Sequence, residues 1–214
     1  MIKLERTSVM NFENAIRGMR NPMKSWDKSD SYTTHIENPE TLNTAPFQFF
    51  MGENDLKLAR HLASAGGDHR KFLRQIFVSV DITAPLYWWK EYDTYKVGTV
   101  ANSESTMHTI SKGYLTLDDF SHDHLSASGR DFLEWSILPF LNARIERYND
   151  KKDKDDWYDI IQILPTSFNQ MRTCTLNYEN LVNIYHARKD HKLDEWHTLC
   201  DWILTLPYWE AICL

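Results

Sequence analysis

A nearly unbroken apolar run at residues 76–82 predicts the central strand of a sheet. Its members are mostly β-branched or aromatic, and apolar side chains occupy positions where a half-exposed strand would place polar ones. This pattern is typical of a strand covered on at least part of both faces. Asp81 and Thr83 end the run.

The next residues, Ala84-Pro85, predict the start of a helix, because the first helical turn tolerates a proline that lacks an N–H. Leu86, Trp89 and Tyr92 follow at helical spacing. We expect Gly98 to end this helix. The small polar residues at 99–106 then predict a loop that contacts a ligand.

Further segments repeat apolar residues with a helical period. They are residues 12–19, 53–65, 131–148, 157–164, 178–188 and 193–206. In the third of these, Phe132, Trp135, Leu138 and Leu141 are expected to face the core along one stripe. Asn11 is expected to cap the first helix, and Gly66-Gly67 to end the second.

A second strand is predicted at residues 171–176, followed by a helix that Asn177 caps through its side-chain oxygen. Eleven residues make nearly a whole number of helical turns, so Asn177 and Arg188 share a stripe with Leu181 and Ile184. A capping asparagine and an arginine are therefore expected on one helix face. The same pattern also fits a capped core helix with a surface arginine.

Residues 1–8 predict a short edge strand, whereas residues 21–51 carry Asn-Pro twice, Ala-Pro and many Ser and Thr. That composition is typical of a loop, and a loop of this length is often functional or contributes to assembly. Phe47, Phe49, Phe50 and Met51 are expected to be buried, if necessary against another subunit. The charged residues 149–156 predict a solvated turn.

The chain has 214 residues, enough for a single domain (1–214) with a substantial core. Its net charge of -6 argues against a general binder of nucleic acid or of anionic membranes, although a local basic pocket for one nucleotide is compatible with it. No apolar run is long enough to span a bilayer, and the first residues lack a signal-peptide core. A cytoplasmic location is the default expectation.

Three widely spaced cysteines predict reduced thiols rather than a disulfide framework. None of them stands in a context typical of a nucleophile. His122 and His124 would suit one side of a strand, but further ligands are missing nearby, so no metal site is predicted.

The central stretch resembles the signature of flavin-dependent thymidylate synthases, in which a strand, Ala-Pro and an aromatic helix lead into the motif R-H-R-x-x-S-x-N-x-x-S-x-R. Aligned from Ala84-Pro85, the R-H-R positions fall on Thr94, Tyr95 and Lys96, so only the lysine keeps a positive charge. With one inserted residue, Asn102 and Ser105 match the later asparagine and serine. The scaffold matches and the motif is heavily eroded.

The stretch 163–188 resembles the C-terminal signature of the same family, L-P, a strand, and then N-x-x-x-L-x-N-F-x-x-x-R. Six positions match in register: Leu164, Pro165, Asn177, Leu181, Asn183 and Arg188. In the family the two asparagines contact flavin and the final arginine contacts the uracil of deoxyuridylate. An upstream arginine that holds the nucleotide falls on Met171, with Arg172 one place along.

The resemblance implies an α/β (α+β) fold, a twisted and mainly antiparallel sheet packed by helices, in a homotetramer with active sites between subunits. It implies FAD as cofactor and dUMP, methylenetetrahydrofolate and NADPH as partners, for reductive methylation of dUMP to dTMP. Arg188 is the expected catalytic residue. The expected cofactor contacts are Asn177, Asn183, Lys96, Tyr95 and Asn102. Besides Arg188, the expected substrate contacts are Arg172, Ser105, Glu91 and Arg20.

Two functions stay open on the sequence. The matched C-terminal signature favours a divergent flavin-dependent thymidylate synthase or a relative that alkylates a related nucleotide. The eroded R-H-R region favours a non-catalytic homologue that binds a nucleotide or serves in assembly. The role of Arg20 is likewise open: it is either a contact to the nucleotide or flavin, as the resemblance implies, or an ordinary solvated charge at the end of the first helix.

Overall fold

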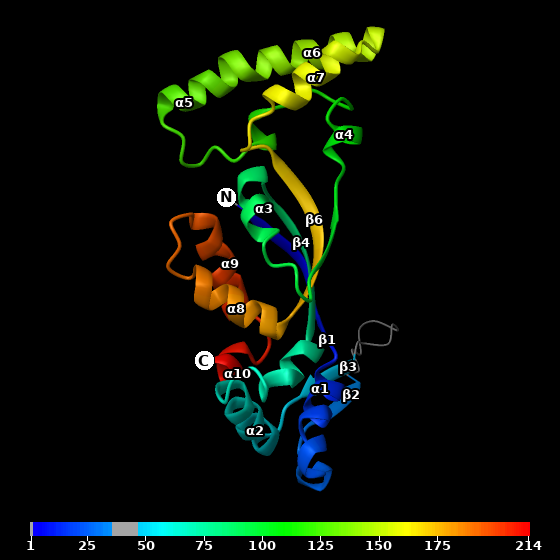
Figure 1. Cartoon of the computed structure of the whole chain (residues 1–214), viewed down its shortest axis with the longest axis vertical. Helices are drawn as coiled ribbons and strands as arrows, with labels where there is room; N and C mark the ends of the chain where they lie inside the picture. The colour runs from blue at the N-terminus through cyan, green and yellow to red at the C-terminus, as the bar shows by residue number, and fades with distance from the viewer. Residues whose placement is uncertain (1, 36–46) are drawn as a thin grey trace.

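The computed structural model describes residues 2–35 and 47–214. Its centre is a four-stranded sheet of β1 (Lys3–Met10), β4 (Phe77–Pro85), β6 (Asn169–Asn177) and β5 (Val100–Ser103). The order is β1-β4-β6-β5 and every neighbouring pair is antiparallel. The twisted sheet stands along the long axis of an elongated molecule (Figure 1). The predicted antiparallel sheet packed by helices is thereby confirmed.

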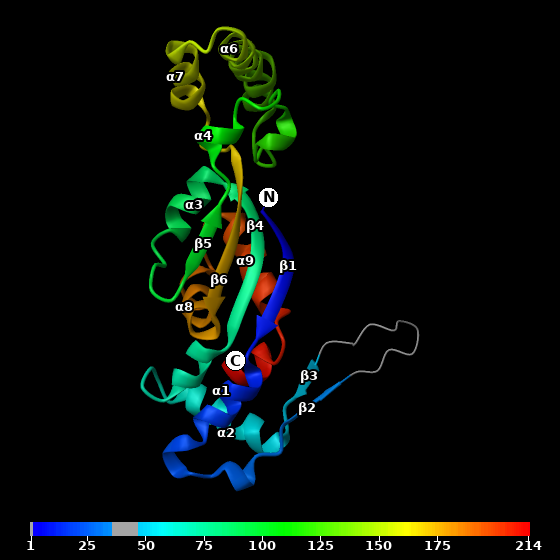
Figure 2. The same cartoon turned by 90° about the vertical axis from the view of Figure 1, so that its right-hand side faces the viewer.

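Strand β4 alternates between a buried and a partly open face. Val78, Val80 and Ile82 are each no more than 1% exposed, whereas Phe77 is 41% exposed. Helices α8 (Tyr178–Arg188) and α9 (Asp194–Leu204) cover the buried face (Figure 2). The second face is covered only in part, since most of the alternate residues of β4 on that face stay exposed or partly exposed.

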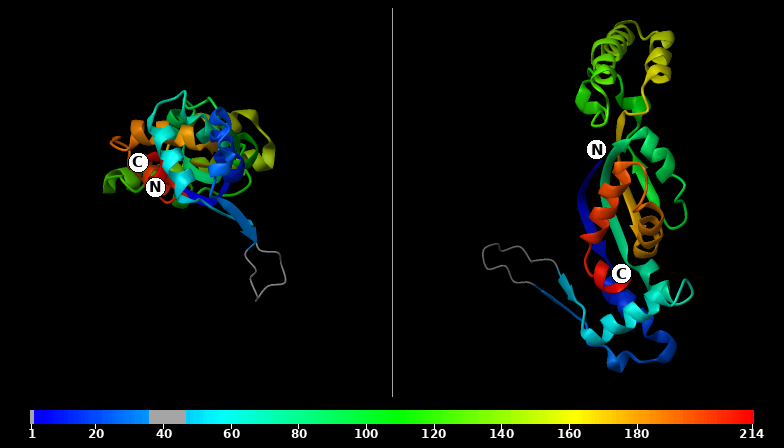
Figure 3. Two further views of the ribbon diagram at one scale, coloured as in Figure 1. Left: turned by 90° about the horizontal axis from the view of Figure 1, so that it is seen from below. Right: turned by 90° about the vertical axis from the view of Figure 1, so that its left-hand side faces the viewer.

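One end of the molecule is built from α1 (Phe12–Met19), α2 (Glu53–Ser64), the 3-10 segment η3 (Arg70–Gln75) and α10 (Trp209–Cys213). Residues 21–51, predicted as loop, contain two 3-10 turns, η1 (Asn21–Met23) and η2 (Trp26–Lys28), and a hairpin of β2 (Tyr32–His35) with β3 (Phe47–Phe50). The hairpin projects from the body (Figure 3). The loop prediction was wrong at those strands, whose cross-strand pairs form where the sequence has too few residues to establish a period. Residues 36–46 lie outside the described part, and so does the side chain of Phe47.

The other end is a helical hairpin in which α5 (Ala127–Phe132), a π-helical turn η5 (Leu133–Ile137) and α6 (Leu138–Lys151) run on as one rod beside α7 (Lys154–Ile163). The core-facing stripe predicted here was partly wrong, since Phe132 is 61% and Trp135 73% exposed. A π turn adds a residue to the repeat and rotates the helix face. Leu138 and Leu141 are buried as predicted, and Leu133, five residues before Leu138, is buried instead of Phe132 and Trp135.

The helix α3 (Leu86–Tyr92) ends six residues earlier than predicted, at Tyr92 instead of near Gly98. Residues 99–106, predicted as a loop, include edge strand β5, which pairs with β6, and the start of the single turn α4 (Thr106–Thr109). A further 3-10 turn, η4 (Leu117–Asp119), precedes the helical hairpin. Periodicity could not find β5 because all four of its side chains are exposed.

Candidate functional site

The junction of α3, α8 and α9 brings together three of the predicted site residues. Arg188, in the last turn of α8, donates from Nη1 to Glu91 Oε2 at 2.8 Å and from Nε to the Tyr95 hydroxyl at 2.7 Å. Its guanidinium lies 4.4 Å from the ring centroid of Trp196 on α9. A planar cation, a carboxylate and two aromatic rings therefore form one compact cluster, which we call the Arg188 cluster (Glu91, Tyr95, Arg188, His191 and Trp196).

The carboxylate of Glu91 is the hub of the Arg188 cluster. Its Oε2 also accepts from Trp196 Nε1 at 2.9 Å and lies 3.5 Å from His191 Nε2. The Glu91 side chain is 36% exposed and that of Arg188 16% exposed, so both charges border solvent. This half-buried ion pair presents a donor and an acceptor side by side at the surface.

Arg172 lies on β6, away from the Arg188 cluster. Its Nη1 donates to Asp93 at 2.8 Å, its Nε donates to Gln170 at 3.0 Å, and its guanidinium stacks 4.2 Å from the Trp89 ring centroid. Arg172 is thus held between the end of α3 and its own strand. An anion that bound it would share it with Asp93.

The eroded motif folds along the sheet edge. Asn102 stands opposite Thr173 in the β5–β6 ladder, and Ser105 precedes α4, where its carbonyl accepts from the backbone N–H groups of His108 and Thr109. Glu104 fixes this segment, because its carboxylate accepts from the Met171 N–H at 2.9 Å. Asn102, Ser105 and also Lys96 are exposed, so their side chains face solvent.

The start of α8 confirms the predicted cap. Asn177 Oδ1 accepts from Asn180 N–H at 3.0 Å, and Asn180 Oδ1 accepts from Asn177 N–H at 3.1 Å. The loop between α3 and β5 passes close to this cap. Asn180 Nδ2 donates to the Val97 carbonyl at 2.7 Å, and a Cβ on Gly98 would lie 3.0 Å from Asn177 Nδ2. Gly98 also has φ of +76°, which favours glycine. Asn11 behaves differently: it precedes α1 as predicted, but no side-chain hydrogen bond caps that helix.

Asn183 lies on the exposed side of α8, next to two arginines of η3. Its Oδ1 accepts from Arg70 Nη2 at 3.2 Å, and Arg70 and Arg74 both pair with Glu179. Two guanidinium groups on one carboxylate leave net positive charge beside an amide. The pKa of Glu179 lies below its ordinary value: burial opposes ionisation, and hydrogen bonds from Arg74 and Arg70 outweigh that effect.

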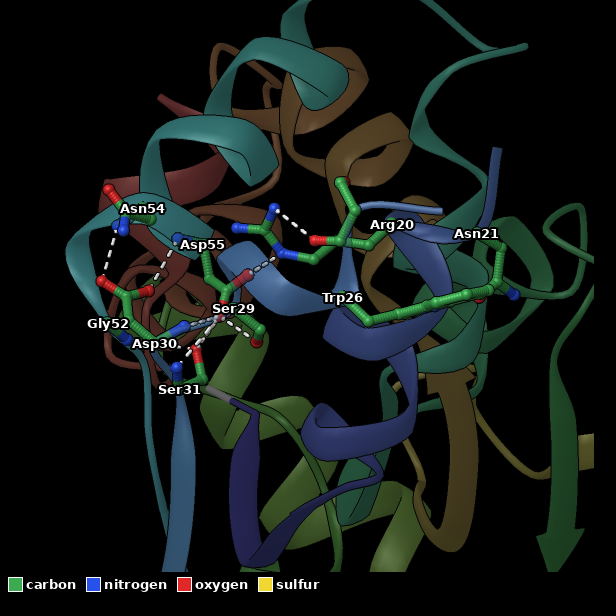
Figure 4. A network of polar contacts seen from close by, with 10 residues as sticks. Arg20, Asn21, Trp26, Ser29, Asp30, Ser31, Gly52, Asn54 and Asp55 are labelled. Carbon is green, nitrogen blue, oxygen red and sulfur yellow. Dashed lines mark hydrogen bonds and ion pairs between the residues drawn. The ribbon is translucent and has the colours of Figure 1, made fainter. Parts of the chain in front are cut away.

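Arg20 is 4% exposed and forms a buried ion pair, so it is not the solvated helix charge of the alternative interpretation. Its Nε donates to Asp55 Oδ1 at 2.5 Å, and its Nη1 to the Ser25 carbonyl at 3.3 Å. The other oxygen of Asp55 accepts from the hydroxyls of Ser29 and Ser31, each at 2.7 Å (Figure 4). This network ties residues 25–31 to the first turn of α2.

The cysteines and the pair His122 and His124 add no further candidate site. Burial raises the pKa of Cys174 and of Cys200 to about 11 in each case, so both are protonated at neutral pH and poor nucleophiles. His122 Nδ1 lies 2.9 Å from the Phe120 carbonyl, and His124 lies 3.4 Å from Asp194. Among residues 2–35 and 47–214, no three metal-ligating side chains converge.

The structure therefore brings Glu91, Tyr95 and Arg188 together, whereas Arg172, Arg20 and Asn183 each contact other residues. Sequence reasoning missed Trp196 and His191, since a tryptophan on an apolar stripe looks like core alone. It also missed the partners of Arg20 and Arg70. The signal for Asp55 was present, as a carboxylate among the apolar positions of an amphipathic helix.

Comparison with solved structures identifies the fold. Thymidylate synthase X (ThyX) from Helicobacter pylori, solved with FAD and dUMP, superposes with a TM-score of 0.67 at 13% identity, over 99% of this chain and 97% of that one. The chain has the ThyX fold. A UMP/dUMP methylase, PolB from Streptomyces cacaoi, solved with 5-Br dUMP, superposes with a TM-score of 0.59 at 13% identity, over 99% of this chain and 94% of that one.

Sequence comparison alone gives no such relative, because no family model and no curated protein matches the chain. At 13% identity the structural likeness establishes the ThyX fold and leaves the activity to the residues. No helix in the described part is long and apolar enough to cross a membrane.

The Helicobacter pylori ThyX of the same fold was solved with FAD, and this chain carries amides and cations of the kinds that bind a flavin nucleotide. The exposed amides of Asn102 and Asn183 suit the carbonyl and nitrogen atoms of a flavin ring. Arg70 and Arg74, which share one carboxylate, together with exposed Lys96 suit a diphosphate. The close approach of Gly98 to Asn177 leaves no room there for a larger side chain.

Proposed function

We propose that this chain binds a deoxyuridylate-type nucleotide at the Arg188 cluster and methylates it with the help of FAD. The observation that carries the proposal is the Glu91–Arg188 pair, with Nη1 and Oε2 2.8 Å apart and both side chains bordering solvent. The two solved structures with the same fold, one with dUMP and one with 5-Br dUMP bound, support the choice of nucleotide.

The chemistry of the pair matches the edge of uracil, which presents an N–H between two carbonyl oxygens. Oε1 of Glu91 has no hydrogen bond to the described residues and can accept the uracil N3–H. Arg188 can donate to a neighbouring carbonyl through a nitrogen of its fork that Glu91 and Tyr95 do not occupy. The partly exposed ring of Tyr95 adds an aromatic surface beside the pair, and the buried ring of Trp196 supports the guanidinium from below.

The residues that would hold FAD are Asn102, Asn177, Asn183, Lys96 and Tyr95, with Arg70 and Arg74 nearby. FAD, when bound, supplies the hydride chemistry that no side chain can provide. This chain contributes binding and orientation: Arg188 polarises a uracil carbonyl, and Ser105, Arg172 and Arg20 remain proposed substrate contacts. Methylenetetrahydrofolate would supply the one-carbon group and NADPH the reducing equivalents.

A second function, a non-catalytic relative that has lost the full flavin and dUMP site and serves in assembly or binds a nucleotide weakly, is favoured by the pairing of its arginines. Arg20, Arg172 and Arg188 each face a carboxylate of the same chain, namely Asp55, Asp93 and Glu91. A nucleotide phosphate must compete with these carboxylates. A site neutralised in this way binds a dianion more weakly than a site with free arginines.

The proposed assembly is a homotetramer with sites between subunits. Exposed apolar side chains at the sheet edge and on the helical hairpin support it, among them Val100 at 71% and Trp135 at 73% exposure. A partner subunit could supply the cations that the eroded R-H-R positions lack.

Release of tritium from 5-tritiated dUMP, in the presence of FAD, NADPH and methylenetetrahydrofolate, tests the proposal. We expect release above the rate without protein, and loss of release in Arg188→Ala. Saturable dUMP binding without release would replace methylation by the non-catalytic function. Absence of both binding and release at millimolar dUMP contradicts both functions.

A further inference from the structure

A cavity of about 670 Å³ opens where β1 meets α1, far from the Arg188 cluster. The hairpin β2–β3 and the segment Pro207-Tyr208 close its sides. The cavity lies beside the first residue of β4, since its lining residue Met10 pairs with Phe77. Helix α3, which carries Glu91 of the Arg188 cluster, follows the last residue of β4. Nine strand residues separate the two places, a span of roughly 30 Å at the rise of an extended chain. The volume is in the range that small-molecule sites occupy.

Three aromatic rings form the apolar wall of this cavity. Phe12 and Phe49 stack with centroids 5.6 Å apart and planes at 6°, and Tyr208 meets Phe12 edge-on at 5.5 Å. Phe12 is fixed in the core by Tyr178, which meets it edge-on at 5.6 Å. A flat ring can pack against such a wall.

Backbone strain beside the cavity is held by long-range contacts. Asn11 and Tyr208 both line it and both have left-handed backbones, with φ of 73° and 57°. Asn11 Nδ2 donates to the Gln75 carbonyl at 2.9 Å, and the Tyr208 hydroxyl is bonded to both Met51 N–H and the Phe49 carbonyl at 3.2 Å. Strain of this kind persists where the surroundings over-determine it, and it concentrates at functional sites. The cavity is therefore preformed.

The charge of the lining selects the ligand. Among the described residues of the lining, Glu13 is the charged one and there is no Lys, Arg or His. Its Oε2 accepts from Thr33 Oγ1 at 3.0 Å, and none of the described residues donates to its Oε1, which a ligand can use. Asn14, Gln48 and Asn11 add amides. A carboxylate beside aromatic rings suits a planar group with adjacent N–H donors and repels an anion.

We propose that this cavity is a second binding site, distinct from the Arg188 cluster, for an aromatic amidine or aminated heterocycle that carries no phosphate. The ring packs against Phe12 and Phe49, and its paired N–H groups donate to the Glu13 carboxylate. The site is independent of the proposed nucleotide chemistry, because it shares no residue with it.

Benzamidine is a suitable probe, with benzoate as the matched ligand in which the same ring carries a carboxylate. Binding is measured on the full chain by ligand-observed NMR titration. We expect benzamidine to bind with a Kd on the order of 1 mM, as is typical of a small fragment, and benzoate to bind at least about tenfold more weakly because Glu13 repels it.

Glu13→Gln keeps an acceptor for Thr33 and removes the charge, so we expect it to weaken benzamidine about fivefold or more. Glu146→Gln on α6, an exposed position away from the cavity, serves as the matched control and leaves the Kd unchanged. Equal affinity for both ligands, no benzamidine binding at 20-fold the expected Kd (~20 mM), or an unchanged Kd in Glu13→Gln overturns the proposal. The comparison of the two ligands needs no variant and so stands even if Glu13→Gln fails to fold.

Discussion

Arg188 and Glu91 meet across the gap between α8 and α3, with Nη1 and Oε2 2.8 Å apart, although 97 residues separate them in the chain. Trp196 of α9 contacts both, since its ring lies under the guanidinium and its Nε1 donates to the same carboxylate oxygen. One ion pair thus joins three helices. Any role that it has in binding is combined with a role in stability.

Arg188→Ala should weaken dUMP binding about 10- to 100-fold, equivalent to about 1.4–3 kcal/mol, because the variant loses charge-assisted donors. It should also lower the free energy of unfolding by about 1–3 kcal/mol, since Glu91 and Tyr95 lose their partner. Isothermal titration and urea unfolding measure the two effects. Arg188→Lys keeps the charge without the planar fork and should recover stability more than affinity. A stability loss with unchanged dUMP affinity shows that Arg188 is structural.

Asn177→Ala should destabilise the fold by about 1 kcal/mol, because both hydrogen bonds of the capping box are lost or left half-made. Asn177→Asp retains an acceptor at the helix start and should cost less. The matched variant is Asn183→Ala, an exposed position of the same helix, where a change within about 0.5 kcal/mol is expected. Thermal or urea unfolding distinguishes them, and equal losses at the two positions would contradict the capping role.

Asp55→Asn should destabilise the fold by about 3–5 kcal/mol, since it leaves the buried charge of Arg20 without a partner. In the native chain, burial by itself raises the pKa of Asp55, but hydrogen bonds from Ser31, Ser29 and Arg20 outweigh it and bring the pKa below its ordinary value of 3.8. A carboxyl with a depressed folded pKa contributes stability above its unfolded pKa. That contribution is lost as the pH falls through the folded pKa.

Unfolding followed at several pH values checks this assignment. The native chain should lose stability as the pH falls below about 4, and part of that loss should be absent in Asp55→Asn. The same steepness in the two proteins would show that other carboxyls carry the acid sensitivity.

Trp135→Glu should lower the assembly state without unfolding the chain. Trp135 is 73% exposed on the π turn, where a large apolar side chain gains from a partner surface. Light scattering after size-exclusion chromatography measures the mass, and circular dichroism checks the fold. A native chain that is monomeric at high concentration would contradict the proposed homotetramer.

The sequence predicted well those elements that bury one face, because burial of one face sets the spacing of their apolar residues. Phe12, Ala15, Ile16 and Met19 on α1 are all buried as expected. Strand β5 escaped prediction because hydrogen bonds to β6, not side-chain burial, hold it in place. Phe132 and Trp135 faced the wrong way because a π turn changes the period that the prediction assumed.

At the candidate site, the sequence supplied single residues and the fold supplied their partners. Arg188 and Asn177 were expected from helix spacing and capping, and Asn177 does cap α8. The carboxylates opposite Arg20, Arg172 and Arg188 depend on contacts between distant segments, which spacing cannot show. Because these carboxylates compete with a nucleotide phosphate for the arginines, the choice between catalysis and a non-catalytic function has to be made by experiment.

The most direct test of uracil recognition is to compare the affinities of dUMP and dCMP by isothermal titration with the native chain and Glu91→Gln. Uracil has a donor at N3 and cytosine an acceptor, so the carboxylate of Glu91 should favour dUMP about tenfold or more, equivalent to about 1.4 kcal/mol. Glu91→Gln should reduce that ratio, because an amide can present either its oxygen or its nitrogen. Equal affinity for the two nucleotides in the native chain, or no binding of either, would contradict uracil recognition by the Glu91–Arg188 pair.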